Sequence, residues 1–168
     1  MATINLSDIQ GGGHPSRHGA TNVPYTVEVE VDFAAALASK GAALAATDVI
    51  EAIAVPAGTM VLNAGVEVVT AADSQTLTVD VGVTGVDPDV FVDGFNAKGA
   101  AGTYSQNPAA FQPVVIGGTA DTVDVLLATL TDDTGNAPLT TGALRVWAVL
   151  VDVSAKKAPG VATPTASA

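Results

Sequence analysis

The chain has 168 residues, which suits a single domain, and its 17 Asp and Glu against 6 Lys and Arg give a net charge of −11. Because phosphate binding depends on Lys and Arg, this balance excludes sequence-independent nucleic-acid binding and attraction to an anionic membrane surface. The sequence has no Cys, which excludes disulfides and cysteine nucleophiles. It predicts no signal peptide and no membrane-spanning segment.

Residues 1–24 predict an extended N-terminal arm. They contain the run Gly11–Gly13, and Gly-rich chain is flexible unless something holds it in place. The few apolar residues of the arm suit small anchors on a partner protein. The predicted partner contacts of the arm are Ile4, Leu6, Ile9 and Arg17.

Residues 25–153 predict one β-sheet domain. From Tyr25 to Phe33 apolar and polar residues alternate, which is the period of a strand with one buried and one acidic face. Asp32 and Gly41 suit the two caps of a short helix over residues 33–40. Further strands are predicted over residues 49–55, 60–69, 76–83, 90–93, 112–116, 123–130 and 144–153.

Breaks in the pattern define the connections. Gly65 inside a strand predicts a bulge or bend, Asp87-Pro88-Asp89 predicts a turn, and residues 94–111 predict a long irregular loop. The last strand, 144–153, is apolar on both faces, so we expect it at the centre of a sheet or covered on both sides.

The chain therefore predicts about eight strands in an all-β domain, followed by a C-terminal tail over residues 154–168. Short strands separated by turn signals are typical of an antiparallel β-sandwich, and the jelly roll is the favoured topology.

Two histidines have the spacing of metal ligands. His14 and His18 stand four residues apart, as two ligands on one helix face do. Pro15 and the neighbouring glycines exclude a helix there, and no third ligand is near. We therefore expect no metal ion at this position.

Acidic turns are the other candidate for a metal. Asp87, Asp89 and Asp93 crowd one turn, and carboxylates in loops bind calcium. The spacing departs from an EF-hand loop because no Glu closes it. A solvated turn is the preferred interpretation here and for Asp132-Asp133, and no cofactor is expected.

The sequence also predicts no catalytic residues. Glu28, Glu30 and Asp32 alternate on an open strand face, where carboxylates stay solvated and keep the sheet soluble. Both histidines lie in the arm, which leaves no Ser-His-Asp arrangement, and no glycine-rich phosphate loop follows a strand. We therefore expect no enzyme activity.

Arg145 and Trp147 are the notable residues of the last strand. Core packing is the default for Trp147, the only Trp, and an interface anchor is the alternative. A charge at Arg145, close to Val149 and Val151, needs a carboxylate or a partner. We predict that Arg145 and Trp147 serve packing or contact between subunits.

Several stretches of the chain resemble small virion proteins of tailed bacteriophages. They are residues 48–62, Val79-Asp80-Val81-Gly82, Asp93-Gly94-Phe95, residues 121–129 and residues 142–152. The resemblance spans residues 25–153 and is to the capsid decoration, or cement, proteins. It implies a β-sandwich or jelly roll that oligomerises on the outer capsid surface and clamps neighbouring major capsid subunits, with no active-site residues.

The resemblance thus predicts a virion protein on the capsid exterior, with the major capsid protein and further copies of itself as partners. A trimer is favoured over a dimer. One alternative is another virion part, such as a tail protein or a fibre base. The other is a carbohydrate- or calcium-binding sandwich, which the acidic turn at residues 87–93 and the aromatic residues Phe95 and Tyr104 suggest.

Overall fold

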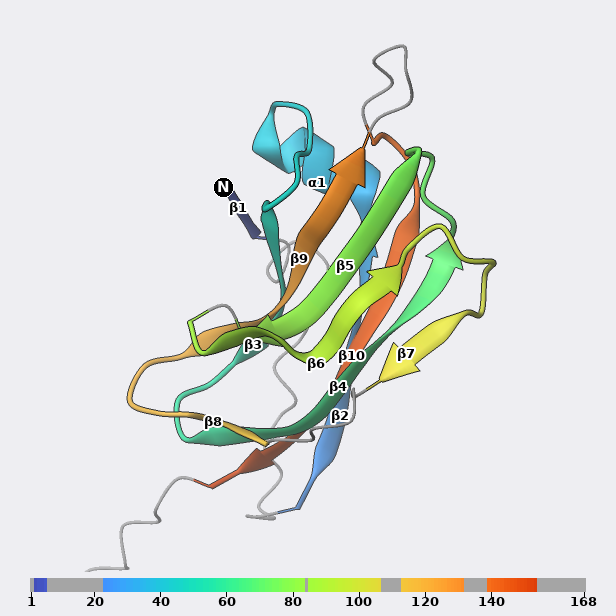
Figure 1. Cartoon of the computed structure of the whole chain (residues 1–168). Coiled ribbons are helices and arrows are strands. Elements are labelled where there is room, and N and C mark those ends of the chain that lie inside the picture. The colour runs from blue at the N-terminus through green and yellow to red at the C-terminus, as the bar shows by residue number, and fades with distance from the viewer. Residues whose placement is uncertain (1, 6–22, 84, 107–112, 132–138, 154–168) are drawn as a thin grey trace, which may run out of the picture.

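The computed structural model describes residues 2–5, 23–83, 85–106, 113–131 and 139–153. In chain order the elements are β1 (Thr3–Asn5), β2 (Tyr25–Asp32), α1 (Phe33–Lys40), β3 (Val49–Val55), β4 (Thr59–Thr70), β5 (Thr76–Val83), β6 (Asp87–Asn96), β7 (Tyr104–Gln106), β8 (Val114–Ile116), β9 (Asp121–Thr131) and β10 (Ala143–Asp152). Two packed β-sheets dominate the structure (Figure 1), which confirms the predicted all-β sandwich.

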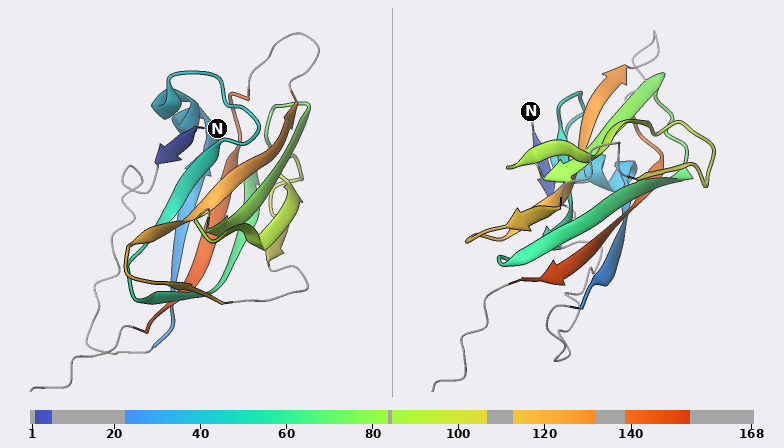
Figure 2. Two further views of the ribbon diagram at one scale, coloured as in Figure 1. Left: turned by 60° about the vertical axis from the view of Figure 1, so that its left-hand side comes forward. Right: turned by 60° about the horizontal axis from the view of Figure 1, so that its bottom comes forward.

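Each sheet has a defined strand order. One runs β1-β3-β9-β5-β6, and the other runs β2-β10-β4-β7, with β8 also paired to β4. The two further views in Figure 2 show the sheets as separate layers that face each other. Apart from the parallel pair β1 and β3, all of these strand pairs are antiparallel.

The strands pair as in one long hairpin, in which the first strands of the sandwich pair with the last ones. β2 pairs with β10, β3 with β9, β4 with β7 and β8, and β5 with β6. From β2 to β5 and again from β6 to β10, each step of the chain passes between the two sheets, except the step from β7 to β8, which both pair with β4. A long hairpin rolled in this way is a jelly roll, the topology that the strand pattern favoured.

The strand bounds agree with the sequence pattern to within two residues, except for β1, β7 and both ends of β6, which runs on to Asn96 inside the predicted loop. β1 lies within the predicted arm, because Ile4 is apolar and pairs with Ile50 at the edge of a sheet. β7 lies within the predicted loop over residues 94–111. β6 begins at Asp87 instead of residue 90, so the turn signal at Asp87-Pro88-Asp89 was wrong: the turn lies before it, where the Val86 amide donates to the Val83 carbonyl oxygen at 2.8 Å.

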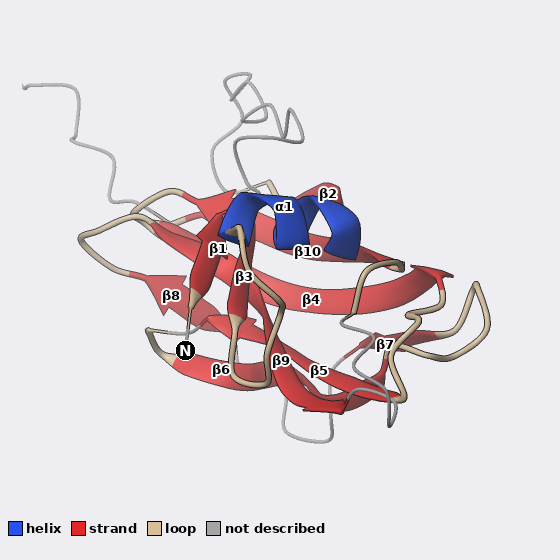
Figure 3. Cartoon of the chain, turned by 90° about the horizontal axis from the view of Figure 1, so that it is seen from above, coloured by secondary structure: helices blue, strands red, loops and turns tan. Residues whose placement is uncertain are grey.

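Helix α1 has both predicted caps. The Asp32 carboxylate accepts from the Ala34 amide at 2.7 Å, and Gly41 adopts the left-handed conformation at φ 68° and donates to the Leu37 carbonyl at 3.0 Å. Seen from above in Figure 3, the helix lies over one end of the sandwich, near β1 and β2. With eight residues it is too short to span a membrane, and it is the only helix among the described residues.

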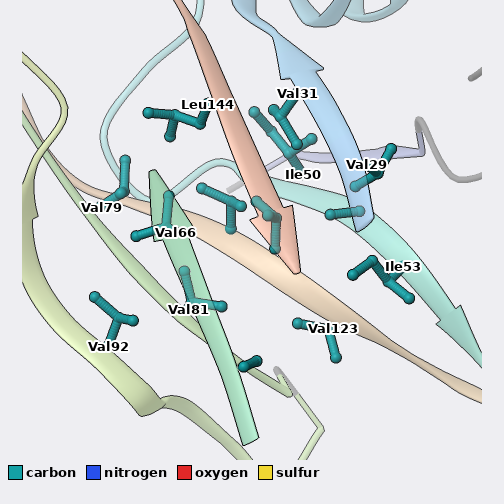
Figure 4. Close-up of a cluster of buried hydrophobic side chains, with 14 of the residues drawn as sticks. Val29, Val31, Ile50, Ile53, Val66, Val79, Val81, Val92, Val123 and Leu144 are labelled. Atoms are coloured by element: carbon teal, nitrogen blue, oxygen red, sulfur yellow. The ribbon is translucent and has the colours of Figure 1, made fainter. Parts of the chain in front are cut away.

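The core lies between the sheets and consists largely of aliphatic side chains. Figure 4 shows valines, isoleucines and leucines from both sheets that point toward one another. Val31 on β2 pairs with Leu144 on β10, and Figure 4 shows Ile50 of the facing sheet beside Val31. Burial of these side chains is the main stabilising contribution, and it leaves the outward residues of each strand for other roles.

Candidate interaction surface

Strand β10 carries Arg145 and Trp147, the two notable residues of the last predicted strand. It lies between β2 and β4, so the prediction of a central strand is confirmed. Leu144, Val146 and Ala148 are fully buried in the core. The residues between them, Arg145, Trp147 and Val149, point to the outer face of the sheet and are half-buried or exposed. Trp147 is therefore not a core residue.

Trp147 lies against a glycine on the neighbouring strand. It pairs with Gly65 of β4, and a Cβ atom on Gly65 would lie 2.5 Å from Cζ2 and 2.7 Å from Cε2 of the indole. Because ordinary carbon contacts are 3.5 to 4 Å, only a residue without a side chain fits beneath the ring. The predicted bulge at Gly65 is wrong: the register shifts of β4 fall at Leu62 and Val69, and the glycine serves the close approach of Trp147.

Arg145 has a carboxylate partner, as its position required. Its guanidinium donates to Glu67 Oε2 on β4 at 3.0 Å, and the two side chains are 45% and 32% exposed. A surface ion pair of this kind contributes well under about 1 kcal/mol to stability. On the other side of Arg145 the register places Glu30 of β2, and Glu28 lies opposite Trp147.

The same face carries further polar and aromatic groups at its edge. Tyr104 on β7 pairs with Glu67 and is 71% exposed. Phe95 on β6, in contrast, lies in the core. Of the two aromatic residues that suggested a carbohydrate site, only Tyr104 is thus available at the surface.

Ile4 has a different role from the one predicted for the arm. Its side chain is 3% exposed and belongs to the core of its own chain. β1 is further held because the Ala2 amide donates to Asp48 Oδ1 at 2.9 Å and the Val49 amide donates to the Ala2 carbonyl at 2.8 Å. In this arrangement Ile4 anchors the arm to its own domain and is not free to contact a partner.

Asp48 is a buried carboxylate that accepts several hydrogen bonds, a role that the sequence did not indicate. Besides Ala2, it accepts from the Ala45 amide at 2.9 Å and from Lys40 Nζ. Burial raises the pKa of the Asp48 carboxyl, but these hydrogen bonds and the Lys40 charge outweigh burial and lower it below its usual value. Asp48 therefore joins the end of α1, the following loop and β1.

The acidic turn does not form a metal site in the described residues. Among them, no group of three His, Asp or Glu side chains is placed to hold a metal ion. Asp89 lies close to Asp87, and the hydrogen bond to Asp87, burial and repulsion raise the pKa of the Asp89 carboxyl. Asp80 accepts from the Gly94 amide at 2.7 Å, and burial raises the pKa of its carboxyl.

Several predicted site residues lie outside the described residues. They are Leu6, Ile9, His14, Arg17, His18, Asp132 and Asp133. Their predicted roles stay predictions, as does the division into an arm, a domain and a C-terminal tail. The candidate site that the structure does assemble is the outer face of β2, β10 and β4 around Trp147.

Comparison with known proteins supports the class of this fold. No family model and no curated protein matches the chain. Among solved structures, a chain in the capsid of Ralstonia phage GP4 aligns with a TM-score of 0.60 and 17% identity, over 92% of this chain and 100% of that one. A chain in the capsid asymmetric unit of cyanophage Pam1 aligns with a TM-score of 0.54 and 16% identity, over 82% and 90%.

The chain therefore has the fold of proteins found in phage capsids, in agreement with the resemblance seen in its sequence. The alignment with the Ralstonia phage chain covers that whole chain, so the shared unit is the complete jelly roll and not a fragment of it.

Proposed function

We propose that this protein decorates the outer surface of a phage capsid and cements neighbouring major capsid subunits. The observation that carries the proposal is the full-length match of its jelly roll to a chain of the Ralstonia phage capsid. A protein that binds only the assembled shell stabilises that shell by mass action, and no covalent chemistry is needed.

The charge distribution supports a position outside the shell. The described residues include fourteen of the 17 Asp and Glu but only three cations, Lys40, Lys98 and Arg145. Each of the three is engaged within the chain, by Asp48, the Ser74 carbonyl and Glu67 respectively. Such a surface repels packaged DNA, so the capsid exterior is the compatible location.

The contacts that we propose come from two parts of the chain. Leu6, Ile9 and Arg17 of the arm, which follow Ile4 in the sequence, bind the capsid. Arg145 and Trp147 present the outer face of β10 as the second contact with the capsid. Self-association is proposed to give a homotrimer, which would match a local three-fold axis of the shell.

Binding to shells tests the proposal directly. The full-length protein is mixed with purified expanded capsids that lack it, and co-sedimentation measures the bound fraction. We expect saturable binding and a higher temperature of capsid disassembly. Labelled antibody on intact particles separates the alternatives, since label on the tail or fibres with none on the head would refute decoration. Light scattering of the free protein tests the trimer.

The arm is tested without disturbing the fold. Because Ile4 lies in the core, a variant with Leu6→Ser, Ile9→Ser and Arg17→Ser in the full chain is better than a deletion of residues 1–22. We expect at least tenfold weaker binding to shells with unchanged thermal stability of the free protein. Unchanged affinity would refute the role of the arm.

A further inference from the structure

The outer face of β10 is organised in rows across three strands. In one row Glu30, Arg145 and Glu67 lie side by side, and in the next row Glu28, Trp147 and Gly65 do. Val149 continues the apolar line along β10. We call the residues Glu28, Glu30, Glu67, Arg145, Trp147 and Val149 the Trp147 face.

The Trp147 face is the side of the sheet that does not form the core. The core lies against the opposite side of β10, and α1 lies over one end of the sandwich, as Figure 3 shows. Within the described residues, no sheet or helix forms a layer over this face. The only Trp of the chain thus lies at the centre of an outward sheet surface, not inside the sandwich.

The indole is held in one place before any partner arrives. Gly65 lets the ring lie directly against the β4 backbone, and the Ser105 carbonyl oxygen of β7 lies 2.8 Å from where a Gly65 side chain would begin. A ring fixed in this way loses little conformational entropy on binding. Trp and Arg are among the residue types that contribute most to protein–protein affinity when they lie at the centre of an interface. Here Trp147 and Arg145 lie on the same outer face of β10.

The charges of the face indicate the chemistry of the partner. Three carboxylates surround one guanidinium, and that guanidinium binds Glu67. Glu28 and Glu30 are exposed and make no ion pair with any described cation, since Lys40 and Lys98 are engaged elsewhere. A second copy of the chain, with its other cations Arg17, Lys156 and Lys157 included, carries the same net charge of −11, so a partner of complementary charge is a different protein.

We infer that the Trp147 face binds a protein surface that places an apolar side chain on the indole and Lys or Arg side chains against Glu28 and Glu30. The inference rests on the proposed function, because the capsid shell is the source of that surface. It assigns the main contact of the folded domain to β10 and β2, apart from any contact made by the arm.

Matched charge reversals test the inference. Glu28→Lys changes the face, and Asp93→Lys makes the same change in charge at an exposed position on β6 in the other sheet. Binding to capsids lacking the protein is measured by co-sedimentation at low and high salt. We expect Glu28→Lys to weaken binding at least tenfold and Asp93→Lys to leave it within threefold. The wild-type affinity should fall with salt, because exposed charges are screened.

The apolar centre is tested separately. Trp147→Ala should weaken binding about thirtyfold or more, the effect of losing a central Trp at an interface. Oxidative labelling with mass spectrometry then reports whether Trp147 is protected in the bound wild-type protein. Because Glu28 is exposed, Glu28→Lys keeps the test valid even where Trp147→Ala destabilises the fold.

The outcomes separate the two proposals. If the wild-type protein does not bind capsids, the proposed function fails and the occupant inferred here fails with it. If it binds while Glu28→Lys and Trp147→Ala bind equally well and Trp147 stays reactive, only the inference is overturned. Protection of Trp147 in a free oligomer that dissociates in the Glu28→Lys variant would show that a second copy occupies the face, which also overturns it.

Discussion

Replacing Gly65 with Ala should destabilise the protein through one side chain, Trp147. The new methyl carbon would lie 2.5 Å from Cζ2 and 2.7 Å from Cε2 of the indole, and 2.8 Å from the Ser105 carbonyl oxygen. All three distances are well inside van der Waals contact, so the ring must leave its place on β4 or β7 must shift.

The magnitude follows from two opposing effects. Overpacking by one methyl group costs about 1–3 kcal/mol, whereas Ala is favoured over Gly in a strand by about 0.5–1 kcal/mol. The two ranges give a net loss in the free energy of unfolding of about 0–2.5 kcal/mol, and we expect about 1 kcal/mol. Most of it should depend on the indole, since the ring supplies the two closest contacts.

A double-mutant cycle in urea isolates this contribution. Gly65→Ala, Trp147→Ala and the double variant are unfolded by urea, with Gly117→Ala as the control, because nothing lies within 4 Å of a side chain at Gly117. We expect Gly65→Ala to cost about 1 kcal/mol less when Trp147 is absent. In the single variant the emission of the only Trp should shift to longer wavelength. Full additivity in the cycle would refute the close approach.

Three further predictions concern the buried polar groups and the arm. Asp48→Asn should lower the free energy of unfolding by about 2–3 kcal/mol, because it leaves Lys40 without its buried carboxylate. Since the pKa of Asp48 is lowered in the fold, this stabilisation is present above the unfolded pKa of about 3.9 and is lost as pH falls through the lower folded value. The stabilities of the two proteins, measured by urea titration, should therefore converge in acid. Asp80→Asn should act in the opposite direction, with a small gain in stability at pH 7 that disappears in acid, because the pKa of Asp80 is raised and its ionised form is disfavoured in the fold; a loss of stability at pH 7 would contradict this. Ile4→Ala should release β1, which amide exchange would detect as faster exchange of the Val49 amide while the β10 amides stay protected.

The β-sandwich could be predicted because the core residues of its strands alternate in sequence with outward-facing residues. On β2 the apolar residues from Tyr25 to Val31 all face the core, and Val79 and Val81 do so on β5. Period-two alternation of this kind specifies both a strand and its buried face. β1 and β7 have three residues each, too few for a period to be seen, and they form only because an edge of a sheet is available.

The candidate surface was less accessible to sequence reasoning. Arg145 signalled that a carboxylate was needed but not which one, since Glu67 lies 78 residues away in the chain. Trp147 lies on an apolar strand, which made the core its expected place, and only the pairing with Gly65 places the ring on the outside. In the sequence Gly65 predicts a bulge, because nothing local distinguishes a glycine that bends a strand from one that makes room for a ring.

Two pairs of carboxylates in the domain show contrasting physical roles. Asp48 and Asp73 each accept several hydrogen bonds, which outweigh the cost of burial and lower the pKa of both carboxyls. These two stabilise the connections between elements, as Asp73 does by accepting from the Thr140 amide at 3.0 Å. Glu28 and Glu30 accept no such bond from the residues that the structure describes. Their charge is available to a partner, and the cations that Glu28 and Glu30 lack within the domain define what that partner must bring.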